Sequence, residues 1–358
     1  MIMKVSDFGK SYIFLPDATQ GSVKYVDSRS LWEIGTKGVV VNTLHLAFNL
    51  GLERMHRLGG IHKLMDWNGI VLSDSGGFQV FSLIHRKAWH GKISDEGAEF
   101  KHPNTGQKIY LTPEFSLDMQ MAIGSDICVV LDDCRDANIS RHEAEESVER
   151  TIKWAYRSKK YWDKKYAQKG KLLSAVVQGA QFLDLREYCA KELTKIGFDG
   201  YNFGGFVVDD DGNLVEDELR LVAQNTPEDK FRYGMGIGKP LDIVKAASLG
   251  YKVFDTVLVT RNARHGTLYV GDREDSIKIN IRNEQFAEDF SPIDTTCDCF
   301  ACTHFSKAYV RHLLRQKEGV GYMLASIHNL RFYQRLTNSL NGMDGGLLVK
   351  KILLLNAS

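Results

Sequence analysis

The sequence lacks a hydrophobic run of the roughly 20 residues that a membrane-spanning helix needs. Its first ten residues lack the apolar stretch of a secretory signal. Low-complexity segments and internal repeats are also missing, and neither sign of charge is in excess, because the formal net charge is +1. We therefore expect a cytoplasmic protein without membrane partners. A global attraction to polyanions is excluded, although a local basic patch would suffice to bind nucleic acid.

What the chain does contain is typical of a soluble globular protein with a large core. Of its 358 residues, 43% are hydrophobic and 25% are charged. One run, 150–171, is rich in Lys and Arg and carries Trp and Tyr at helical spacing. Such a run can bind nucleic acid, but a solvated helix whose aromatic side chains face the core is the better interpretation.

Cysteine is scarce, and the six cysteines fall into two groups. Three are isolated and are expected to be buried thiols: Cys128, Cys134 and Cys189. The others are crowded within six residues, which in a cytosolic chain indicates a metal ion rather than disulfides: Cys297, Cys299 and Cys302.

Three thiolates and one imidazole would complete a closed tetrahedral shell for a structural zinc ion. His328 lies 26 residues after Cys302, which leaves room for a helix to fold back. His304 and His312 compete with it as fourth ligand, although His304 is too close to Cys302 in the sequence for easy closure. The sequence pattern leaves the histidine open.

Short apolar runs alternate with longer amphipathic segments along the chain, which predicts a parallel sheet. Seven or eight such units in about 260 residues fit a (β/α)₈ barrel better than an open doubly wound sheet. The expected strands are 39–41, 70–72, 127–131, 172–177, 200–203, 232–235 and 253–259, and expected helices include 141–160, 183–195 and 240–249.

Acids, amides and glycines follow these runs repeatedly. They are Asn42-Thr43, Asp74, Asp132-Asp133, Gln178-Gly179, Gly204-Gly205, Gly236-Ile237-Gly238 and Asp255. In a barrel, the carboxyl ends of the strands and the loops that follow them form the active-site face. Packing alone does not require polar residues at every strand end, so this pattern predicts a functional site there.

The segment Asp74-Ser75-Gly76-Gly77-Phe78-Gln79 delivers an acid, a flexible turn, an aromatic ring and an amide to one point. Taken alone, it could equally be a turn in which Asp74 caps a helix and Phe78 belongs to the core. Beside the other strand ends, it is better interpreted as half of an active site.

The acids Asp74, Asp132-Asp133 and Asp255 can divide the labour of glycosidic chemistry, one as nucleophile and one as proton carrier. Asp132 beside Gln178 suits the donor edge of a base such as guanine, because a carboxylate only accepts hydrogen bonds. Gly204-Gly205 offers backbone groups at close range. Phe78 and Met235 would form a stacking slot. Each residue alone has an ordinary structural explanation, as a cap or as core, but together they describe a nucleobase pocket.

In their order along the chain, these motifs resemble those of the tRNA-guanine transglycosylases, from about residue 38 to 333. The matching segments are Asn42-Thr43-Leu44-His45-Leu46, 73–79, 124–126, 131–134, 178–179, 204–205, 235–240, 254–255 with 260–261, and the set Cys297, Cys299, Cys302 and His328. The resemblance implies a modified (β/α)₈ barrel with a zinc subdomain, and it favours His328 as the fourth ligand.

The resemblance also implies an activity: a guanine in tRNA is exchanged for a 7-deazaguanine by a ping-pong route through a covalent ribosyl-enzyme. Asp255 would be the nucleophile at C1′ and Asp74 the general base, supported by Asn42 and Gln79. The purine edges would be read by Asp132, Gln178 and Gly205, with Phe78 and Met235 on either side of the ring. The residues that contact the anticodon loop would be Arg261, Arg264 and Lys239.

As implied partners we expect a tRNA with a GUN anticodon, whose wobble guanine leaves its stack, and a 7-deazaguanine base. Val208 favours preQ1 as that base, with queuine as the second candidate. The enzyme is expected to be a homodimer in queuosine biosynthesis or salvage. Domain boundaries follow: a barrel over 1–290, a helical zinc subdomain over 291–345 and a tail over 346–358.

The chain departs from the family pattern in places. The loop Phe206-Val207-Val208-Asp209-Asp210-Asp211 stands where most bacterial members carry a Gly-Glu pair, and 84–93 is longer than usual. Two alternatives therefore stay open. One is a relative that modifies DNA or another tRNA position, and the other is a non-catalytic tRNA-binding subunit, which the retention of both Asp74 and Asp255 disfavours.

Overall fold

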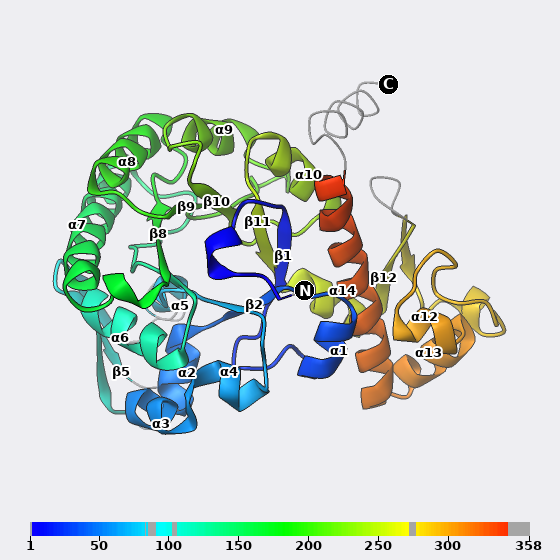
Figure 1. Ribbon diagram of the computed structural model, residues 1–358. Coiled ribbons are helices and arrows are strands. Elements are labelled where there is room, and N and C mark those ends of the chain that lie inside the picture. The colour runs from blue at the N-terminus through cyan, green and yellow to red at the C-terminus, as the bar shows by residue number, and fades with distance from the viewer. Residues whose placement is uncertain (1, 83, 85–90, 102–105, 272–276, 343–358) are drawn as a thin grey trace.

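Eight short parallel strands form the centre of the molecule, with helices around them (Figure 1). The computed structural model describes residues 2–82, 84, 91–101, 106–271 and 277–342. The barrel strands are β1 (Ile13–Pro16), β2 (Gly38–Val41), β3 (Ile70–Ser73), β7 (Ile127–Val129), β8 (Leu172–Val177), β9 (Gly200–Phe203), β10 (Phe231–Gly234) and β11 (Val253–Thr256). Hydrogen bonds link them in the order β1-β11-β10-β9-β8-β7-β3-β2.

Contacts between β1 and β2 close the ring. Asp17 and Val40 form an isolated parallel bridge, and the Ala18 N–H donates to the Val40 carbonyl at 2.7 Å. The predicted (β/α)₈ barrel is therefore confirmed. The sequence runs predicted every barrel strand except β1, whereas the strands outside the barrel were not predicted. The run 253–259 is wrong at its end, because β11 stops at Thr256 and a helix begins at Leu258.

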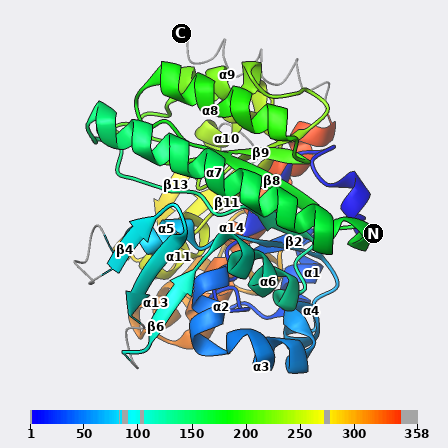
Figure 2. The ribbon, with the colours of Figure 1, turned by 90° about the vertical axis from the view of Figure 1, so that its left-hand side faces the viewer.

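The helices cover the outside of the barrel, and α7, α8 and α9 pack next to one another on one flank (Figure 2). Their bounds are α1 (Ser28–Glu33), α2 (Thr43–Asn49), α3 (Gly51–Leu58), α4 (Gly60–Met65), α5 (Gly77–Phe81), α6 (Pro113–Ile123), α7 (Arg141–Lys165), α8 (Leu183–Ile196), α9 (Glu216–Gln224), α10 (Pro240–Ser248) and α11 (Leu258–His265). After the barrel come α12 (Phe300–His304), α13 (Lys307–Arg315) and α14 (Gly319–Gly342).

Helix α7 contains most of the basic run 150–171. It begins with a capping box, in which Ser140 and Glu143 each bond the other's backbone. Trp154 and Trp162 are buried in the core, while basic side chains of the helix pair with acids such as Asp95, Glu114 and Asp118. This arrangement supports the interpretation of the run as a solvated helix with a core-facing aromatic side, except at Tyr156, which is exposed.

Two small antiparallel sheets extend the barrel. Strands β4 (Gly91–Ser94), β5 (Gly97–Lys101) and β6 (Lys108–Leu111) lie between α5 and α6, and β12 (Thr267–Val270) pairs with β13 (Ile277–Asn280) after α11. The unusually long stretch 84–93 lies mostly outside the described residues.

The long helix α14 stands between the barrel and the small unit formed by α12 and α13 (Figure 1). It also packs on β1, where Gln334 Nε2 donates to the Phe14 carbonyl at 3.1 Å. The Tyr333 hydroxyl donates to the Gly238 carbonyl in the loop after β10. The boundary at residue 290 stays a prediction, and the tail 346–358 lies outside the described residues. Within the part of the chain that is described, no helix is long and apolar enough to cross a membrane.

Candidate active site and metal centre

A layer of functional side chains lies at the carboxyl ends of the barrel strands. Leu15, Val40, Leu72, Val176, Tyr233 and Val253 pack together inside the barrel. Because side chains alternate along a strand, the residues two positions later face the same interior, one layer nearer the mouth. We call this set of residues the mouth ring, and its members are Asp17, Asn42, Asp74, Gln178, Met235 and Asp255. The strands are staggered, so Asp255 is level with Leu15 and Asp17 lies nearer the mouth.

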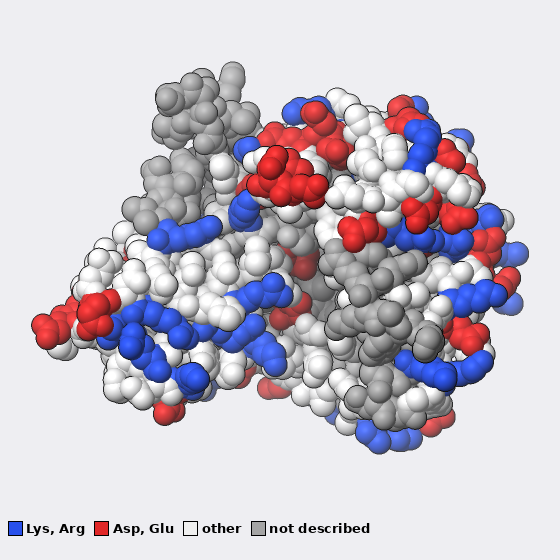
Figure 3. Space-filling model, turned by 180° about the vertical axis from the view of Figure 1, so that it is seen from behind, with Lys and Arg blue, Asp and Glu red and all other residues white. Residues whose placement is uncertain are grey.

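Figure 3 views the protein from the side opposite to Figure 1 and shows acidic side chains within a hollow, with Lys and Arg along one border. The sequence analysis identified five of the six members of the mouth ring. Asp17 was missed together with β1. The signal that could have found it is the apolar run 12–15, which is followed by an acid two residues beyond Leu15.

Asp74 is held by the start of α2. Its carboxylate accepts from Asn42 Nδ2 at 2.5 Å and from the Thr43 N–H at 2.9 Å. Burial raises the pKa of Asp74 to about 7; these two hydrogen bonds act against the rise, and the nearby charge of Asp17 adds to it. Near neutral pH this carboxyl group can therefore both give and take a proton.

The residues that follow Asp74, up to Gln79, are arranged as expected for part of an active site rather than for a helix cap and core. Helix α5 begins at Gly77 without a side-chain cap, so Asp74 does not cap it. The Phe78 side chain is 50% exposed, which excludes the core interpretation of this ring. The amide oxygen of Gln79 is buried without a hydrogen-bond partner among the described residues, and its expected support of Asp74 stays a prediction.

Asp255 lies on β11 and is anchored by β10. The Gly236 N–H donates to its Oδ1 at 2.8 Å, and the buried Tyr233 hydroxyl also bonds it. Burial raises its pKa to about 6, and the charge of Asp17 adds to that rise. At neutral pH Asp255 is mostly an anion with a fixed orientation. Met235, from the same turn, is partly buried against the barrel interior.

Asp132 and Gln178 form a buried pair between the ends of β7 and β8. Gln178 Nε2 donates to Asp132 Oδ2 at 2.7 Å, and the Ser75 hydroxyl donates to Asp132 Oδ1 at 3.1 Å. Desolvation raises the pKa of Asp132 to about 6, with a contribution from the neighbouring charge of Asp133. The structure thus brings the Asp74 segment and the predicted base-reading residues together.

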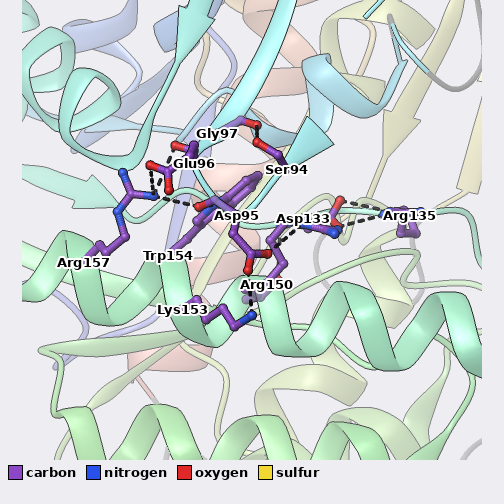
Figure 4. Close-up of polar contacts among 11 residues, drawn as sticks. Ser94, Asp95, Glu96, Gly97, Asp133, Arg135, Arg150, Lys153, Trp154 and Arg157 are labelled. Carbon is purple, nitrogen blue, oxygen red and sulfur yellow. Dashed lines mark hydrogen bonds and ion pairs between the residues drawn. The ribbon is translucent and has the colours of Figure 1, made fainter. Parts of the chain in front are cut away.

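Asp133 has a different role from its neighbour. Its carboxylate receives two hydrogen bonds of 3.0 Å from Arg135 and a further contact from Arg150 (Figure 4). Arg150 and Lys153 also pair with Asp95. These cations hold Asp133 in an ion-pair network, whereas Asp132 bonds only neutral donors.

Gly204 and Gly205 allow a close approach beside Gln178. A Cβ at Gly204 would lie 2.7 Å from Gln178 Nε2, and Gly205 has a φ of +90°, which favours glycine. A cavity of about 160 Å³ next to them is lined by the ends of β8 and β9 and by the loop 206–210. Asn138 reaches Asp210 across it, with contacts of 3.3 and 3.4 Å.

Arg186 of α8 is a second residue that the sequence did not reveal. Its buried guanidinium donates to the carbonyls of Val177, Ala180 and Gly204, at 3.0, 2.8 and 3.2 Å. It therefore fixes the backbone on both sides of Gln178. A single arginine on an amphipathic helix carries no sequence signal for this role, because such residues are usually solvated.

The three predicted RNA-contacting residues lie beyond the same strand ends. Arg261 and Arg264 lie on α11, the first exposed and the second half-buried, and Lys239 is exposed at the start of α10. Arg264 Nη1 has no hydrogen-bond partner among the described residues. Contact with RNA is not tested by this arrangement and stays a prediction.

The crowded cysteines form a buried cluster with a histidine, and this cluster could hold a metal ion. The ligand atoms of Cys297, Cys299, Cys302 and His328 lie within 4.8 Å of one another. His328 Nε2 is 2.7 Å from the Tyr269 carbonyl, so it carries the proton, and Nδ1 faces the sulfur atoms. His304 and His312 are exposed and outside the cluster, which decides the open choice in favour of His328.

Known proteins resemble the chain over most of its length. Residues 10–341 match the family model described as Queuine tRNA-ribosyltransferase. Proteins with that name include one from Symbiobacterium thermophilum, 41% identical over 324 residues (90% of this chain and 78% of the relative). Those from Aquifex aeolicus and Tolumonas auensis are 42% and 39% identical, covering 90% and 94% of this chain and 85% and 87% of theirs.

The ion-pair network around Asp133 generates a prediction on stability. We expect Asp133→Asn to lower the free energy of unfolding by about 3 kcal/mol, because it leaves the largely buried Arg135 without its anion and Arg150 with only the more distant Asp95. Urea unfolding followed by tryptophan fluorescence measures the change. Asp184→Asn, which removes an exposed pair with Arg141, is the control and should change little. Equal effects of the two substitutions would contradict the role given to Asp133.

Proposed function

Because the chain belongs to the queuine tRNA-ribosyltransferase family and is therefore a pentosyltransferase that acts on tRNA, we propose that it exchanges the wobble guanine of tRNAs with a GUN anticodon for a 7-deazaguanine. The observation that carries the proposal is the pairing of two acids, Asp255 and Asp74, at one barrel mouth with the buried Asp132–Gln178 pair. An attacking anion, a proton carrier and a base-reading pair are what this exchange requires.

In the first half-reaction, a carboxylate oxygen of Asp255 forms a bond to C1′ of the target ribose. The C1′–N9 bond breaks, and guanine leaves with the bonding electrons and takes a proton from Asp74. The hydrogen bonds from Gly236 and Tyr233 keep the nucleophile oriented. The product is a covalent ribosyl-enzyme ester.

In the second half-reaction, Asp74 removes the N9 proton of the incoming deazaguanine. The nitrogen then attacks C1′, the ester bond to Asp255 breaks, and both acids return to their starting states. A pKa of about 7 suits Asp74 to both directions of proton transfer.

The purine would be read by groups of fixed polarity. Asp132 only accepts, which matches the N1–H and amino group of a guanine edge, and Gln178 and the Gly205 backbone add further contacts. Phe78 and Met235 would enclose the ring. Asp209 and Asp210 line the cavity next to Gly205, which suits a base with a cationic aminomethyl substituent, such as preQ1.

The RNA would be bound across the rim, with Lys239, Arg261 and Arg264 facing phosphates of the anticodon loop. The target base must leave its stack to enter the mouth. We place the enzyme in the cytoplasm and propose a homodimer, whose second subunit helps to hold the tRNA.

The cysteine–histidine cluster would bind a structural Zn²⁺ ion. A buried Cys₃His set with an oriented histidine fits zinc, and four protein ligands leave no open position for substrate. When bound, the ion supplies folding energy to the small unit around α12 and α13 and no chemistry.

The direct test is the incorporation of labelled guanine into tRNA. We expect incorporation into tRNA but not into duplex DNA, and a covalent RNA adduct on denaturing gels. Asp255→Ala should abolish that adduct because it removes the attacking oxygen, whereas Asp229→Ala, at an exposed acid, should leave it intact. Incorporation only into DNA would refute the proposed substrate, and an adduct that survives in Asp255→Ala would refute the nucleophile.

The two raised pKa values predict different pH limits for the two half-reactions. Asp255 loses its charge below about pH 6, and Asp74 below about pH 7. Between these values the adduct should form, yet the incoming base should not be deprotonated. We therefore expect the ribosyl-enzyme to accumulate near pH 6.5 in rapid-quench assays with preQ1. Adduct levels that do not change between pH 5 and 8 would contradict these assignments.

The metal proposal predicts one zinc ion per chain, measurable by mass spectrometry of the purified protein. Cys302→Ser should lose the ion and lower the melting temperature, because the cluster is buried and joins α12 to α14. His304→Ala should keep both the ion and the melting temperature, since this exposed histidine lies outside the cluster. Zinc retained in Cys302→Ser would rule out this ligand set.

A further inference from the structure

Asp17 is the member of the mouth ring to which the proposed mechanism assigns no task. It directly follows β1, which lies between β11 and β2 in the barrel. Leu15 pairs with Asp255 in the parallel register, so Asp17 faces the same interior two residues nearer the mouth. Its side chain thus lies just outside the attacking carboxylate, on the neighbouring strand.

The electrostatic effects of Asp17 confirm that it is close to both acids. Its charge raises the pKa of Asp74 and of Asp255, and it does the same to the Tyr233 hydroxyl. Such repulsion disfavours the ionised forms of the catalytic acids. No described Lys or Arg pairs with Asp17 to offset it, so packing of the barrel gives no reason for a third acid here.

The carboxylate of Asp17 is held in place before any ligand arrives. Thr19 donates to its Oδ1 twice, from the backbone N–H at 2.6 Å and from the hydroxyl at 2.5 Å. The same loop is tied to β2, because the Asn42 N–H donates to the Thr19 carbonyl at 3.2 Å. Among the described residues, no donor bonds Oδ2, which is left for a ligand that donates a hydrogen bond.

The position of Asp17 in the ring indicates which part of the substrate it meets. Gln178 follows β8, which is four strands away from β1 in either direction around the barrel. The base-reading pair and Asp17 therefore lie on opposite walls, with Asp255 next to Asp17. A nucleotide whose base contacts the far wall and whose C1′ bonds Asp255 has its sugar against the wall formed by β1.

The chemistry of the sugar indicates which of its groups Asp17 contacts. A carboxylate repels phosphate and accepts hydrogen bonds, and the hydroxyl nearest to C1′ is the one on the adjacent carbon, C2′. In glycoside chemistry, hydrogen bonds to this hydroxyl strengthen in the transition state. The 2′-hydroxyl is also the group that distinguishes RNA from DNA.

We propose that Asp17 accepts a hydrogen bond from the 2′-hydroxyl of the target nucleotide and so makes the enzyme selective for a ribose at the exchanged position. The inference rests on the proposed function, and it adds a specificity-determining residue to that site. The competing explanation is structural: Asp17 only shapes the turn through Thr19. Asp17→Asn separates the two, because the amide oxygen still accepts from Thr19 while the negative charge is lost.

The test uses two anticodon stem-loop RNAs of one sequence, with either guanosine or 2′-deoxyguanosine at the exchanged position. Guanine exchange by the full chain gives kcat/KM for each. We expect the wild type to prefer the ribose substrate, and Asp17→Asn to lower that rate by about 10- to 100-fold, the effect of losing a hydrogen bond to a charged group. Loss of the Asp17 charge also lowers the pKa of Asp74 and of Asp255, which affects both substrates alike. The readout is therefore the ratio of the two rates, and we expect the preference for ribose to disappear.

Asp7→Asn, which removes an exposed acid paired with Lys10, is the matched control and should change neither rate. Asp17→Ala should also lose the preference for ribose. That result would show that the loss of the carboxylate, and not the new amide group of Asp17→Asn, causes the effect. Equal losses on both substrates in Asp17→Asn, or a wild type that does not distinguish the two sugars, would overturn the inference. A wild type that exchanges guanine into neither RNA would instead overturn the proposed function, and the inference with it.

Discussion

The central constraint on this structure is the crowding of several carboxylates in one partly dehydrated barrel mouth. Asp74, Asp132 and Asp255 each bond neutral donors: amides, hydroxyls and backbone N–H groups. No described Lys or Arg pairs with them. A cation would stabilise the anions and hold their pKa values low, as well as block the space for a substrate. Neutral donors fix the geometry of the acids and leave their protons exchangeable near neutral pH.

Asp133 is a carboxylate that is stabilised by cations instead of neutral donors. It follows Asp132 directly, yet its carboxylate lies between two arginines and is unavailable for binding. The two neighbours lie in the loop that follows β7, where Asp132 bonds Gln178 and Ser75 and Asp133 bonds the arginines. Asp132 lines the pocket, and Asp133 belongs to the ion-pair network next to it. The sequence Asp-Asp alone does not indicate which of the two acids has which role.

Most of the barrel could be predicted from the sequence, because apolar runs with polar ends recur along the chain. The cysteine cluster was equally visible, and the resemblance to a family identified His328. Strand β1 was missed since it ends in Pro16, a residue that rarely belongs to a strand. Arg186 was missed because its partners are backbone carbonyls distant in sequence, which only the folded chain brings together. The contacts of Arg186 are encoded by no local pattern, whereas β1 carries a local signal in the apolar run 12–15.

Helix α14 joins two parts of the molecule that have separate tasks. His328 faces the cysteine cluster, and less than two turns later Tyr333 and Gln334 bond the loop after β10 and the backbone of β1. Helix α14 therefore connects His328 of the cysteine–histidine cluster to the strands that carry Asp17 and Met235. A metal ion bound at the cluster would therefore influence the order of the barrel mouth through α14, from a position outside the candidate active site.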